Sequence, residues 1–347
     1  MSEAGTSLRP GAVTRAAEPV VRCEALTVRF VGREGTVRAV NGVDFTLNAG
    51  EVLCIVGESG AGKSVALRAM MRLLPAHITD ISGTITIAGK DVMRLDRRAL
   101  GDLRGAEVAM VFQEPMTAFD PVFTIGTQII ETVMRHDGLS QRQARHRALE
   151  LLEMVQIPSP ARRLNNYPHE LSGGMRQRAM IALALCCRPR LLLADEPTTA
   201  LDATVQLQIL QLLRRLQREM QMAVLFVTHD VGVAVEISDR IAVMYAGRFV
   251  ETGPVRAIIR EPQHPYTKGL LASTVHGAMR GRRLEAIPGA PPNLAALPPG
   301  CAFAARCRYV QPACTTAVPP EVWLGHEHMA RCIRVTARSN SGPVRTG

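Results

Sequence analysis

Short apolar runs separated by glycine-containing turns fill the first third of the chain. They lie at 25–30, 39–47, 52–56, 83–87 and 108–112. Runs of this length that are bounded by turn residues are typical of β-strands. The pattern therefore predicts that the fold begins near residue 20 and that its first part is rich in strands.

The period becomes helical farther along. Between 140 and 155 the apolar residues recur on one face, with Arg or Gln opposite them: Ala144, Ala148, Leu151, Leu152 and Val155. Helical patterns at 173–187, 204–220 and 231–237 then alternate with apolar runs at 191–194 and 223–228. Alternation of strand and helix predicts an α/β fold around a parallel sheet.

Periodicity fades at both ends of the chain. Residues 1–19 are small and polar, which predicts a disordered leader, and a disordered tail is predicted for 336–347. From residue 262 onward, prolines and cysteines replace the periodic pattern, so we expect a second unit over 262–335. The main domain is then 20–261, with a helical subdomain at about 115–185.

Composition fits an ordinary globular protein. Of 347 residues, 47% are hydrophobic and 21% are charged, while only 4% are aromatic, so Leu, Ile, Val, Ala and Met must fill the core. No apolar stretch approaches the roughly 20 residues that cross a bilayer. The first twenty residues also lack the apolar block of a secretory signal. We therefore expect a cytoplasmic protein that does not span the membrane.

The net charge is +10, from 41 basic and 31 acidic residues. A basic protein can attract nucleic acid, anionic lipid or nucleotide phosphates, but an arginine-rich soluble surface explains the charge equally well. Platforms for nucleic-acid bases combine basic and aromatic residues, and this chain has few aromatics and no such stretch. Nucleic acid is not an expected partner.

One glycine-rich segment predicts a phosphate site. It follows the apolar run 52–56, opens a helical pattern and fits G-x-x-x-x-G-K-[ST] with Gly57, Glu58, Ser59, Gly60, Ala61, Gly62, Lys63 and Ser64. Backbone N–H groups of such a loop surround phosphates, the lysine reaches the β- and γ-phosphates, and the hydroxyl binds Mg²⁺. ATP and Mg²⁺ are therefore the predicted ligands.

Two carboxylates end the apolar run 191–194. Asp195 is suited to hold Mg²⁺ and Glu196 to polarise an attacking water. Alone, an apolar strand followed by two acids is more often a strand end with solvated carboxylates. The phosphate loop upstream shifts the prediction to a catalytic pair.

A second helix start is also suited to an anion. Ser172 is a plausible N-cap, and Gly173 and Gly174 let a phosphate approach the backbone. Because the loop with Lys63 already serves one nucleotide, this helix start could face the nucleotide of another subunit.

These motifs in their order resemble those of ABC transporter nucleotide-binding domains over residues 20–260: 57–64, Gln113, 171–177, Asp195 with Glu196, 200–202 and His229. The resemblance implies an α/β P-loop ATPase domain with an antiparallel β subdomain and a helical signature subdomain. It also implies a head-to-tail dimer with an identical or paralogous ATPase subunit, in which each ATP lies between two chains.

The same resemblance implies roles for single residues. Gln113 would contact Mg²⁺ and water and link them to membrane subunits, and His229 would contact the γ-phosphate. Asp202 would communicate across the dimer. An aromatic residue of the first strand stacks on adenine in this family, and Phe30 is the candidate, although burial in the core explains that residue equally well.

Finer motifs resemble the ATPases of oligopeptide/dipeptide importers: 112–121, 167–170, 264–267 and 287–332. This implies two membrane permeases, a solute-binding protein and a position on the cytoplasmic face of the membrane. Importers of nickel, glutathione and other small solutes share these motifs, so the solute stays open. A soluble ABC ATPase with two fused units or a coiled-coil insertion is disfavoured, because one phosphate loop and no heptads are present. A subunit that binds ATP without hydrolysing it is disfavoured because every expected polar position is filled.

Four of the eight cysteines, hereafter the tail cysteines, crowd the last fifty residues: Cys301, Cys307, Cys314 and Cys332. Their spacing lacks the C-x-x-C pairs usual in zinc sites, and metal-free apolar cysteines explain it as well. Some members of the resembled importer family carry a [4Fe–4S] cluster in this region. We therefore predict such a cluster, with zinc as the second choice.

Overall fold

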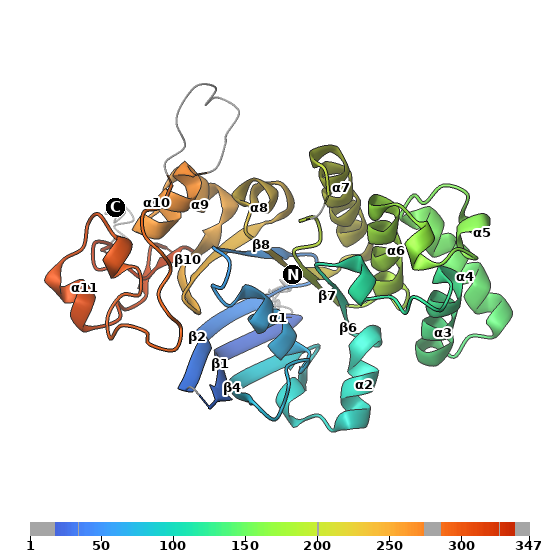
Figure 1. Cartoon of the computed structure of the whole chain (residues 1–347), viewed down its shortest axis with the longest axis horizontal. Coiled ribbons are helices and arrows are strands. Elements are labelled where there is room, and N and C mark those ends of the chain that lie inside the picture. The colour runs from blue at the N-terminus through green and yellow to red at the C-terminus, as the bar shows by residue number, and fades with distance from the viewer. Residues whose placement is uncertain (1–17, 34, 200, 274–285, 326, 337–347) are drawn as a thin grey trace, which may run out of the picture.

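The computed structural model describes residues 18–33, 35–199, 201–273, 286–325 and 327–336. Apart from residues 18, 19 and 336, the predicted leader and tail lie outside the described residues, as does residue 200 of the 200–202 motif. Figure 1 shows an antiparallel sheet and a larger sheet at the centre, a helical part on one side and the C-terminal segment on the other.

The antiparallel sheet has the order β2-β1-β4-β5, and its strands are β1 (Val21–Gly32), β2 (Gly35–Leu47), β4 (Thr79–Ile87) and β5 (Lys90–Asp91). Strand β1 is longer than the predicted run because it pairs with β2 on one side and β4 on the other. Buried and exposed positions alternate along much of β1. This sheet is the predicted antiparallel β subdomain.

The larger sheet has eight strands in the order β11-β12-β10-β9-β3-β8-β7-β6. Its parallel part comprises β3 (Val52–Val56), β6 (Val108–Val111), β7 (Leu191–Asp195), β8 (Ala223–Thr228) and β9 (Arg240–Tyr245). One face of this part packs toward the antiparallel sheet and the other against helices, so β3, β7 and β8 are buried at every position. The carboxyl ends of parallel strands meet at one edge, which gathers the predicted site residues.

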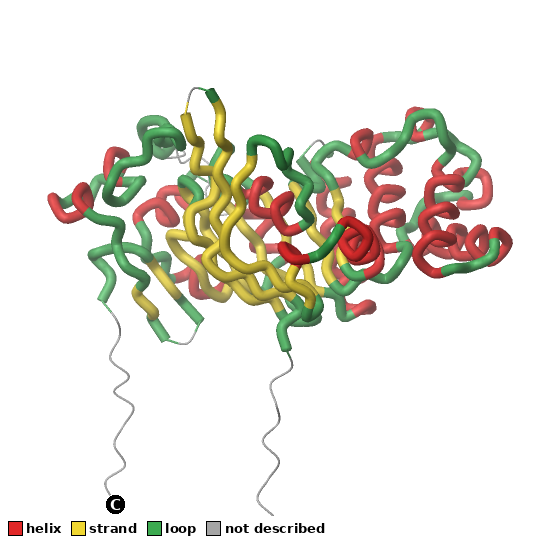
Figure 2. The backbone as a smooth tube through the Cα atoms, turned by 90° about the horizontal axis from the view of Figure 1, so that it is seen from below, coloured by secondary structure: helices red, strands yellow, loops and turns green. Residues whose placement is uncertain are grey.

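Helices α1 (Lys63–Met70), α7 (Ala203–Met220) and α8 (Val231–Ile237) follow strands of this sheet. Helix α2 (Arg97–Ala106) links the two sheets, between β5 and β6. The helical part contains α3 (Ile125–Asp137), α4 (Gln141–Met154), α5 (Pro160–Arg163) and α6 (Gly173–Leu185). Figure 2 shows these helices gathered at one end of the molecule, beyond the strands. Helix α4 matches the predicted 140–155 pattern, whereas α3 was not singled out from the sequence.

The C-terminal segment is joined to the larger sheet. It contains α9 (Val255–Arg260), α10 (Pro265–Ala272), α11 (Pro312–Thr316), β11 (Val322–Trp323) and β12 (Met329–Ala330), and β12 pairs with β10 (Arg248–Pro254). Glu251 of β10 is fully buried and accepts hydrogen bonds from the N–H groups of Gln263 and His264, each at 2.8 Å. His328 Nε2 lies 2.8 Å from the same carboxylate. These contacts fix the C-terminal segment to strand β10 of the larger sheet.

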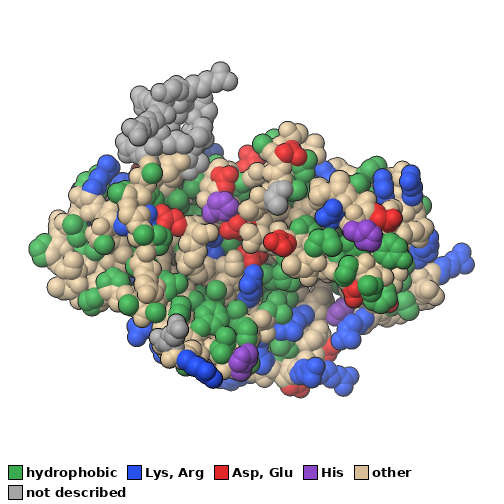
Figure 3. Space-filling model, in the orientation of Figure 1, with side chains coloured by type: hydrophobic (Ala, Val, Ile, Leu, Met, Phe, Trp, Pro, Cys, Tyr) green, Lys and Arg blue, Asp and Glu red, His purple; other side chains and the backbone are tan. Residues whose placement is uncertain are grey.

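Charged side chains of both signs lie on the face of the molecule seen in Figure 3. Figure 3 shows Lys and Arg side chains scattered over the visible face, with acidic side chains between them. In the described part of the chain, no helix is both long enough and apolar enough to span a bilayer.

Candidate active site

The phosphate loop connects β3 to α1 and needs glycine at two positions. A Cβ on Gly57 would lie 2.2 Å from the carbonyl oxygen of Met244 on β9. A Cβ on Gly62 would lie 2.2 Å from the carbonyl oxygen of Ala39, and its φ of +104° is disfavoured for other residues. The loop is therefore held tightly between β2 and β9, which places its backbone before any ligand arrives.

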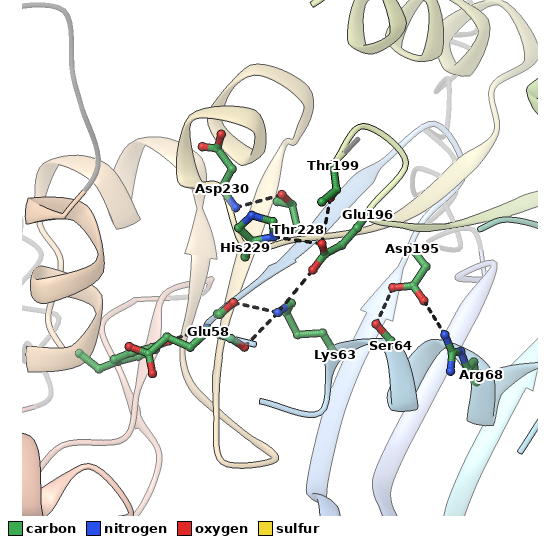
Figure 4. Close-up of polar contacts among 12 residues, drawn as sticks. Glu58, Lys63, Ser64, Arg68, Asp195, Glu196, Thr199, Thr228, His229 and Asp230 are labelled. Atoms are coloured by element: carbon green, nitrogen blue, oxygen red, sulfur yellow. Dashed lines mark hydrogen bonds and ion pairs between the residues drawn. The ribbon is translucent and has the colours of Figure 1, made fainter. Parts of the chain in front are cut away.

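Lys63 begins α1, and its side chain lies inside the loop (Figure 4). It is 4% exposed, and its Nζ donates to the carbonyl oxygens of Gly57 at 2.8 Å and Glu58 at 3.1 Å. Glu196 Oε1 lies 3.8 Å from the same nitrogen. Burial lowers the pKa of Lys63, and the carboxylates around it oppose that shift. The ammonium is thus poised to exchange these carbonyl oxygens for phosphate oxygens.

Ser64 and Asp195 form a pair of oxygen ligands beside Lys63. Ser64 Oγ donates to Asp195 Oδ1 at 2.6 Å, and Arg68 Nη2 lies 3.6 Å from Asp195 Oδ2. Asp195 is 1% exposed, and its Oδ2 has no hydrogen-bond partner among the described residues. Burial raises the pKa of Asp195, while the Ser64 hydrogen bond and Arg68 act in the opposite direction. A buried carboxylate oxygen without a hydrogen bond, beside a hydroxyl, fits a hard cation such as Mg²⁺.

Glu196 lies immediately after β7 in a left-handed conformation with a φ of +46°. Its N–H bonds the carbonyl oxygen of Val227 on β8 at 3.0 Å, which fixes the backbone. Its Oε2 accepts from Thr199 Oγ1 at 2.9 Å and lies 3.0 Å from His229 Nδ1. The carboxylate is therefore oriented from one side by Thr199 and His229, with Oε1 directed toward Lys63 (Figure 4). Oriented carboxylates of this kind act as general bases.

His229 follows β8 and is the most open member of the group. Its side chain is 50% exposed, whereas that of Glu196 is 10% exposed. An open imidazole beside a nearly buried carboxylate can reach a ligand at the mouth of the site. The structure thus brings together five predicted residues that follow three adjacent strands: Lys63, Ser64, Asp195, Glu196 and His229.

The remaining predicted residues lie elsewhere. Gln113 is exposed, two positions after β6. Ser172 is an exposed N-cap of α6 and Asp202 an exposed N-cap of α7, and their side chains accept from backbone N–H groups at 3.4 and 2.9 Å. Figure 1 shows the helical part with α6 apart from α1. These exposed helix starts are available to another chain and not to the phosphate loop of their own chain.

Gly173, Gly174 and Phe30 complete the predicted set. Gly173 is exposed, and a Cβ on Gly174 would lie 3.0 Å from Val205 Cγ1, so α6 and α7 approach closely there. Phe30 is half-buried near the end of β1 and packs against the core of the antiparallel sheet. Its partial exposure agrees both with stacking on adenine and with a place in the core.

Sequence reasoning missed two partners of the phosphate loop. Glu58 directs its carboxylate to Arg306 of the C-terminal segment, at 2.7 and 3.0 Å, and its N–H donates to Tyr266 Oη at 2.9 Å. Tyr266 belongs to the 264–267 motif that indicated the subgroup. Arg306 lies in a segment without periodicity, and no sequence signal connects it to a loop 248 residues away.

The tail cysteines lie in irregular structure around α11. Cys314 and Cys332 are buried, and Cys301 and Cys307 are half-buried. Burial raises the pKa of Cys301, and the N–H of Cys301 donates to the carbonyl oxygen of Cys314 at 2.7 Å. However, no group of three or more His, Cys, Asp or Glu side chains within the described ranges is placed to hold a metal ion. The predicted [4Fe–4S] cluster and the zinc alternative find no support in this arrangement.

Comparison with known proteins identifies two family profiles. The ABC transporter profile matches residues 40–199, which include the phosphate loop, the 171–177 motif and Glu196. The profile of the oligopeptide/dipeptide transporter C-terminal region matches residues 250–314. The second match covers most of the segment that contacts Glu58.

Individual relatives span nearly the whole chain. The dipeptide transport ATP-binding protein DppD of Bacillus subtilis (strain 168) is 47% identical over 91% of this chain and 94% of its own length. The oligopeptide transport ATP-binding protein OppD of Salmonella typhimurium is 45% identical over 89% and 93%. A solved dimeric ATP-binding cassette, in a post-hydrolysis state with ADP and phosphate, is 32% identical with a TM-score of 0.61, and the match covers 68% of this chain and 99% of the cassette. The chain therefore belongs to the ABC transporter family, as an ATP-binding subunit with the oligopeptide/dipeptide transporter C-terminal region.

Proposed function

We propose that this ATPase energises the import of di- or oligopeptides through a membrane ABC transporter. The observation that carries the proposal is the combination of a complete phosphate and carboxylate site with the oligopeptide/dipeptide transporter C-terminal region in one chain. Relatives named for dipeptide and oligopeptide transport, similar over about nine tenths of the chain, support the choice of solute. Nickel, glutathione and other small solutes are the alternative cargo.

The proposed hydrolysis uses residues that the fold has already gathered. Ser64 and Asp195 would hold Mg²⁺, with Gln113 as the further ligand that the family resemblance implies, and the cation would neutralise phosphate charge there. Lys63 binds the β- and γ-phosphates in place of its present carbonyl contacts. Glu196 orients the water and accepts its proton, and His229 contacts the γ-phosphate while holding Glu196 Oε2. Positioning and charge neutralisation supply most of the catalysis in reactions of this class.

We propose a head-to-tail dimer with an identical or paralogous ATPase subunit. Ser172, Gly173 and Gly174 start α6 at an exposed position, so their N–H groups are available to the nucleotide of the opposite subunit. Asp202 caps the neighbouring helix α7 and is also exposed. The solved cassette that resembles this chain is dimeric with ADP and phosphate, which supports a dimer of ATPase subunits.

The remaining partners follow from the proposed transport role. Two membrane permeases would contact the ATPases near Gln113, whose exposed loop connects β6 to the helical part, and a solute-binding protein would deliver the peptide. The ATPase would then lie on the cytoplasmic face of the membrane as a peripheral subunit. We propose the domain division 20–261 for the ATPase and 262–335 for the importer-type extension.

The tail cysteines enter this proposal only as a secondary part. A [4Fe–4S] cluster, or zinc as the second choice, rests on the family resemblance and on the presence of the four tail cysteines in the sequence. No step of ATP hydrolysis is assigned to such a group.

Uptake in a strain lacking this chain tests the proposal. Peptides of graded length are supplied as the sole source of a required amino acid, and labelled nickel uptake is measured in parallel. We expect loss of peptide use that is restored by the wild-type chain and not by Glu196→Gln. Normal peptide use with lost nickel uptake would overturn the peptide assignment in favour of a metal importer.

A further inference from the structure

Arg306 of the C-terminal segment is enclosed by acceptors on all sides of its guanidinium. The side chain is 6% exposed. Its Nη1 and Nη2 bind the two oxygens of Glu58 at 2.7 and 3.0 Å, and its Nε donates to the carbonyl oxygen of Pro288 at 2.8 Å. Tyr245 Oη at 3.2 Å and the carbonyl oxygen of Ile287 at 3.3 Å accept the two remaining N–H groups. All five donors of the guanidinium are therefore used.

Glu58 is the second residue of the phosphate loop, and three of its groups are engaged. Its carboxylate binds Arg306, its N–H donates to Tyr266 Oη at 2.9 Å and its carbonyl oxygen accepts from Lys63 at 3.1 Å. Two of these partners belong to the C-terminal segment and the third is the phosphate-binding lysine. The extension and the lysine thus hold the same loop residue from opposite sides.

The contact is built into a packed aromatic wall. The rings of Tyr245 and Tyr266 are 4.6 Å apart, and Phe303 meets Tyr245 edge-on at 5.3 Å. The guanidinium carbon of Arg306 lies 5.9 Å from the ring centres of both Tyr245 and Phe303. A bidentate pair in such surroundings is geometrically specific, and lysine cannot reproduce it.

We propose that Arg306 is a positioning residue for ATP binding: through Glu58 it holds the phosphate loop of the ATPase in its ligand-ready shape. The inference rests on the proposed ATPase function of the same site. The loop binds phosphates through its backbone N–H groups. When Glu58 is not held by Arg306, the loop must first be ordered, and this ordering costs binding free energy. Release of Arg306 therefore lowers ATP affinity without removing any group that touches ATP.

The test measures the Kd of a fluorescent ATP analogue with Mg²⁺ on the full chain, together with the midpoint of thermal unfolding. Arg306→Ala is expected to raise the Kd about tenfold, as for the loss of one charge-assisted bidentate pair. Arg306→Lys, which keeps the charge and folds more readily, and Glu58→Gln are each expected to raise it about three- to tenfold. The double variant is expected to lose no more than Arg306→Ala alone, because both changes break one interaction.

A matched control lies in the same C-terminal segment. Glu321 accepts from Arg331 Nη2 at 2.6 Å, and neither residue contacts the phosphate loop. Glu321→Gln is expected to leave the Kd unchanged. The proposal is overturned if Arg306→Ala and Arg306→Lys, unfolding well above the assay temperature, bind the analogue as the wild type does. It is also overturned if Glu58→Gln restores wild-type affinity to Arg306→Ala, because Arg306 would then only neutralise a charge. A wild-type chain that does not bind the analogue would instead contradict the ATPase assignment itself.

Discussion

Glu196→Gln separates ATP binding from ATP hydrolysis. The substitution keeps the size of the side chain and an oxygen that can accept from Thr199, which now bonds Glu196 Oε2 at 2.9 Å. It removes the negative charge and the basicity that a catalytic carboxylate needs. The backbone conformation, with its φ of +46°, is equally available to glutamine. The variant is therefore expected to fold and to bind nucleotide.

The magnitude follows from the role of the carboxylate. A positioned general base contributes about 10²- to 10⁴-fold to a rate, which corresponds to about 3 to 5 kcal/mol of activation free energy. ATP affinity is expected to change less than the hydrolysis rate. Glu196 Oε1 lies 3.8 Å from Lys63 Nζ, so its negative charge repels the phosphates that bind Lys63. We expect a Kd within about fivefold of the wild-type value, or about 1 kcal/mol.

Phosphate release and ATP-analogue binding are measured on the same preparation. Glu219→Gln, an exposed acid near the end of α7, serves as the control and is expected to hydrolyse ATP at the wild-type rate. Wild-type hydrolysis by Glu196→Gln would refute the assignment of Glu196 as the base. Loss of ATP binding by the variant would show that the carboxylate builds the phosphate site instead of acting on water.

Four further predictions concern the loop, the cation site, the dimer and the tail cysteines. Gly57→Ala forces a Cβ to within 2.2 Å of a β9 carbonyl oxygen and should abolish ATP binding, whereas Gly60→Ala, with φ +78° and open space, should cost only about 1–2 kcal/mol in chemical denaturation. Burial raises the pKa of Asp195, so the free energy of unfolding of the nucleotide-free protein should fall as pH rises above the pKa of the unfolded-state carboxyl, about 4. Asp195→Asn should flatten this fall, measured by thermal unfolding between pH 4 and 7. The same variant should lose Mg²⁺-dependent hydrolysis. Ser172→Arg should prevent the ATP-induced dimer of Glu196→Gln in size-exclusion chromatography while each chain still binds ATP; an unchanged dimer would contradict the head-to-tail arrangement. Anaerobically purified protein should contain about four iron and four sulfide per chain if the tail cysteines hold a cluster, and neither iron nor sulfide in the folded chain would remove that proposal.

The core of the site could be predicted from sequence because its residues follow buried strands. Four of its residues come directly after an apolar run, or after the loop that follows the run: Lys63, Asp195, Glu196 and His229. Parallel strands carry their carboxyl ends to one edge, so local patterns and one topological rule bring these residues together. The α/β part of the predicted fold class was confirmed for the same reason, since alternating strand and helix patterns predict a parallel sheet.

Contacts between residues that lie far apart in the sequence could not be predicted in this way. Arg306 and Glu58 are 248 positions apart, and neither lies in an element with a period. Helix α3 was missed, and the short strands β11 and β12 carry too few residues to show alternation. The pairing of β12 with β10 depends on tertiary contacts around buried Glu251, which a local pattern does not encode.

The most direct measurement of the central claim is ATP-driven peptide uptake by the complete transporter in liposomes. Wild-type and Glu196→Gln complexes are loaded with Mg²⁺ and ATP on the ATPase side, and labelled di- and tripeptides are offered on the other side with the solute-binding protein. We predict that the wild-type complex accumulates peptide only with ATP and that the variant complex binds ATP but accumulates none. Equal accumulation by both complexes, or accumulation without ATP, would contradict the claim that hydrolysis at this site drives peptide import.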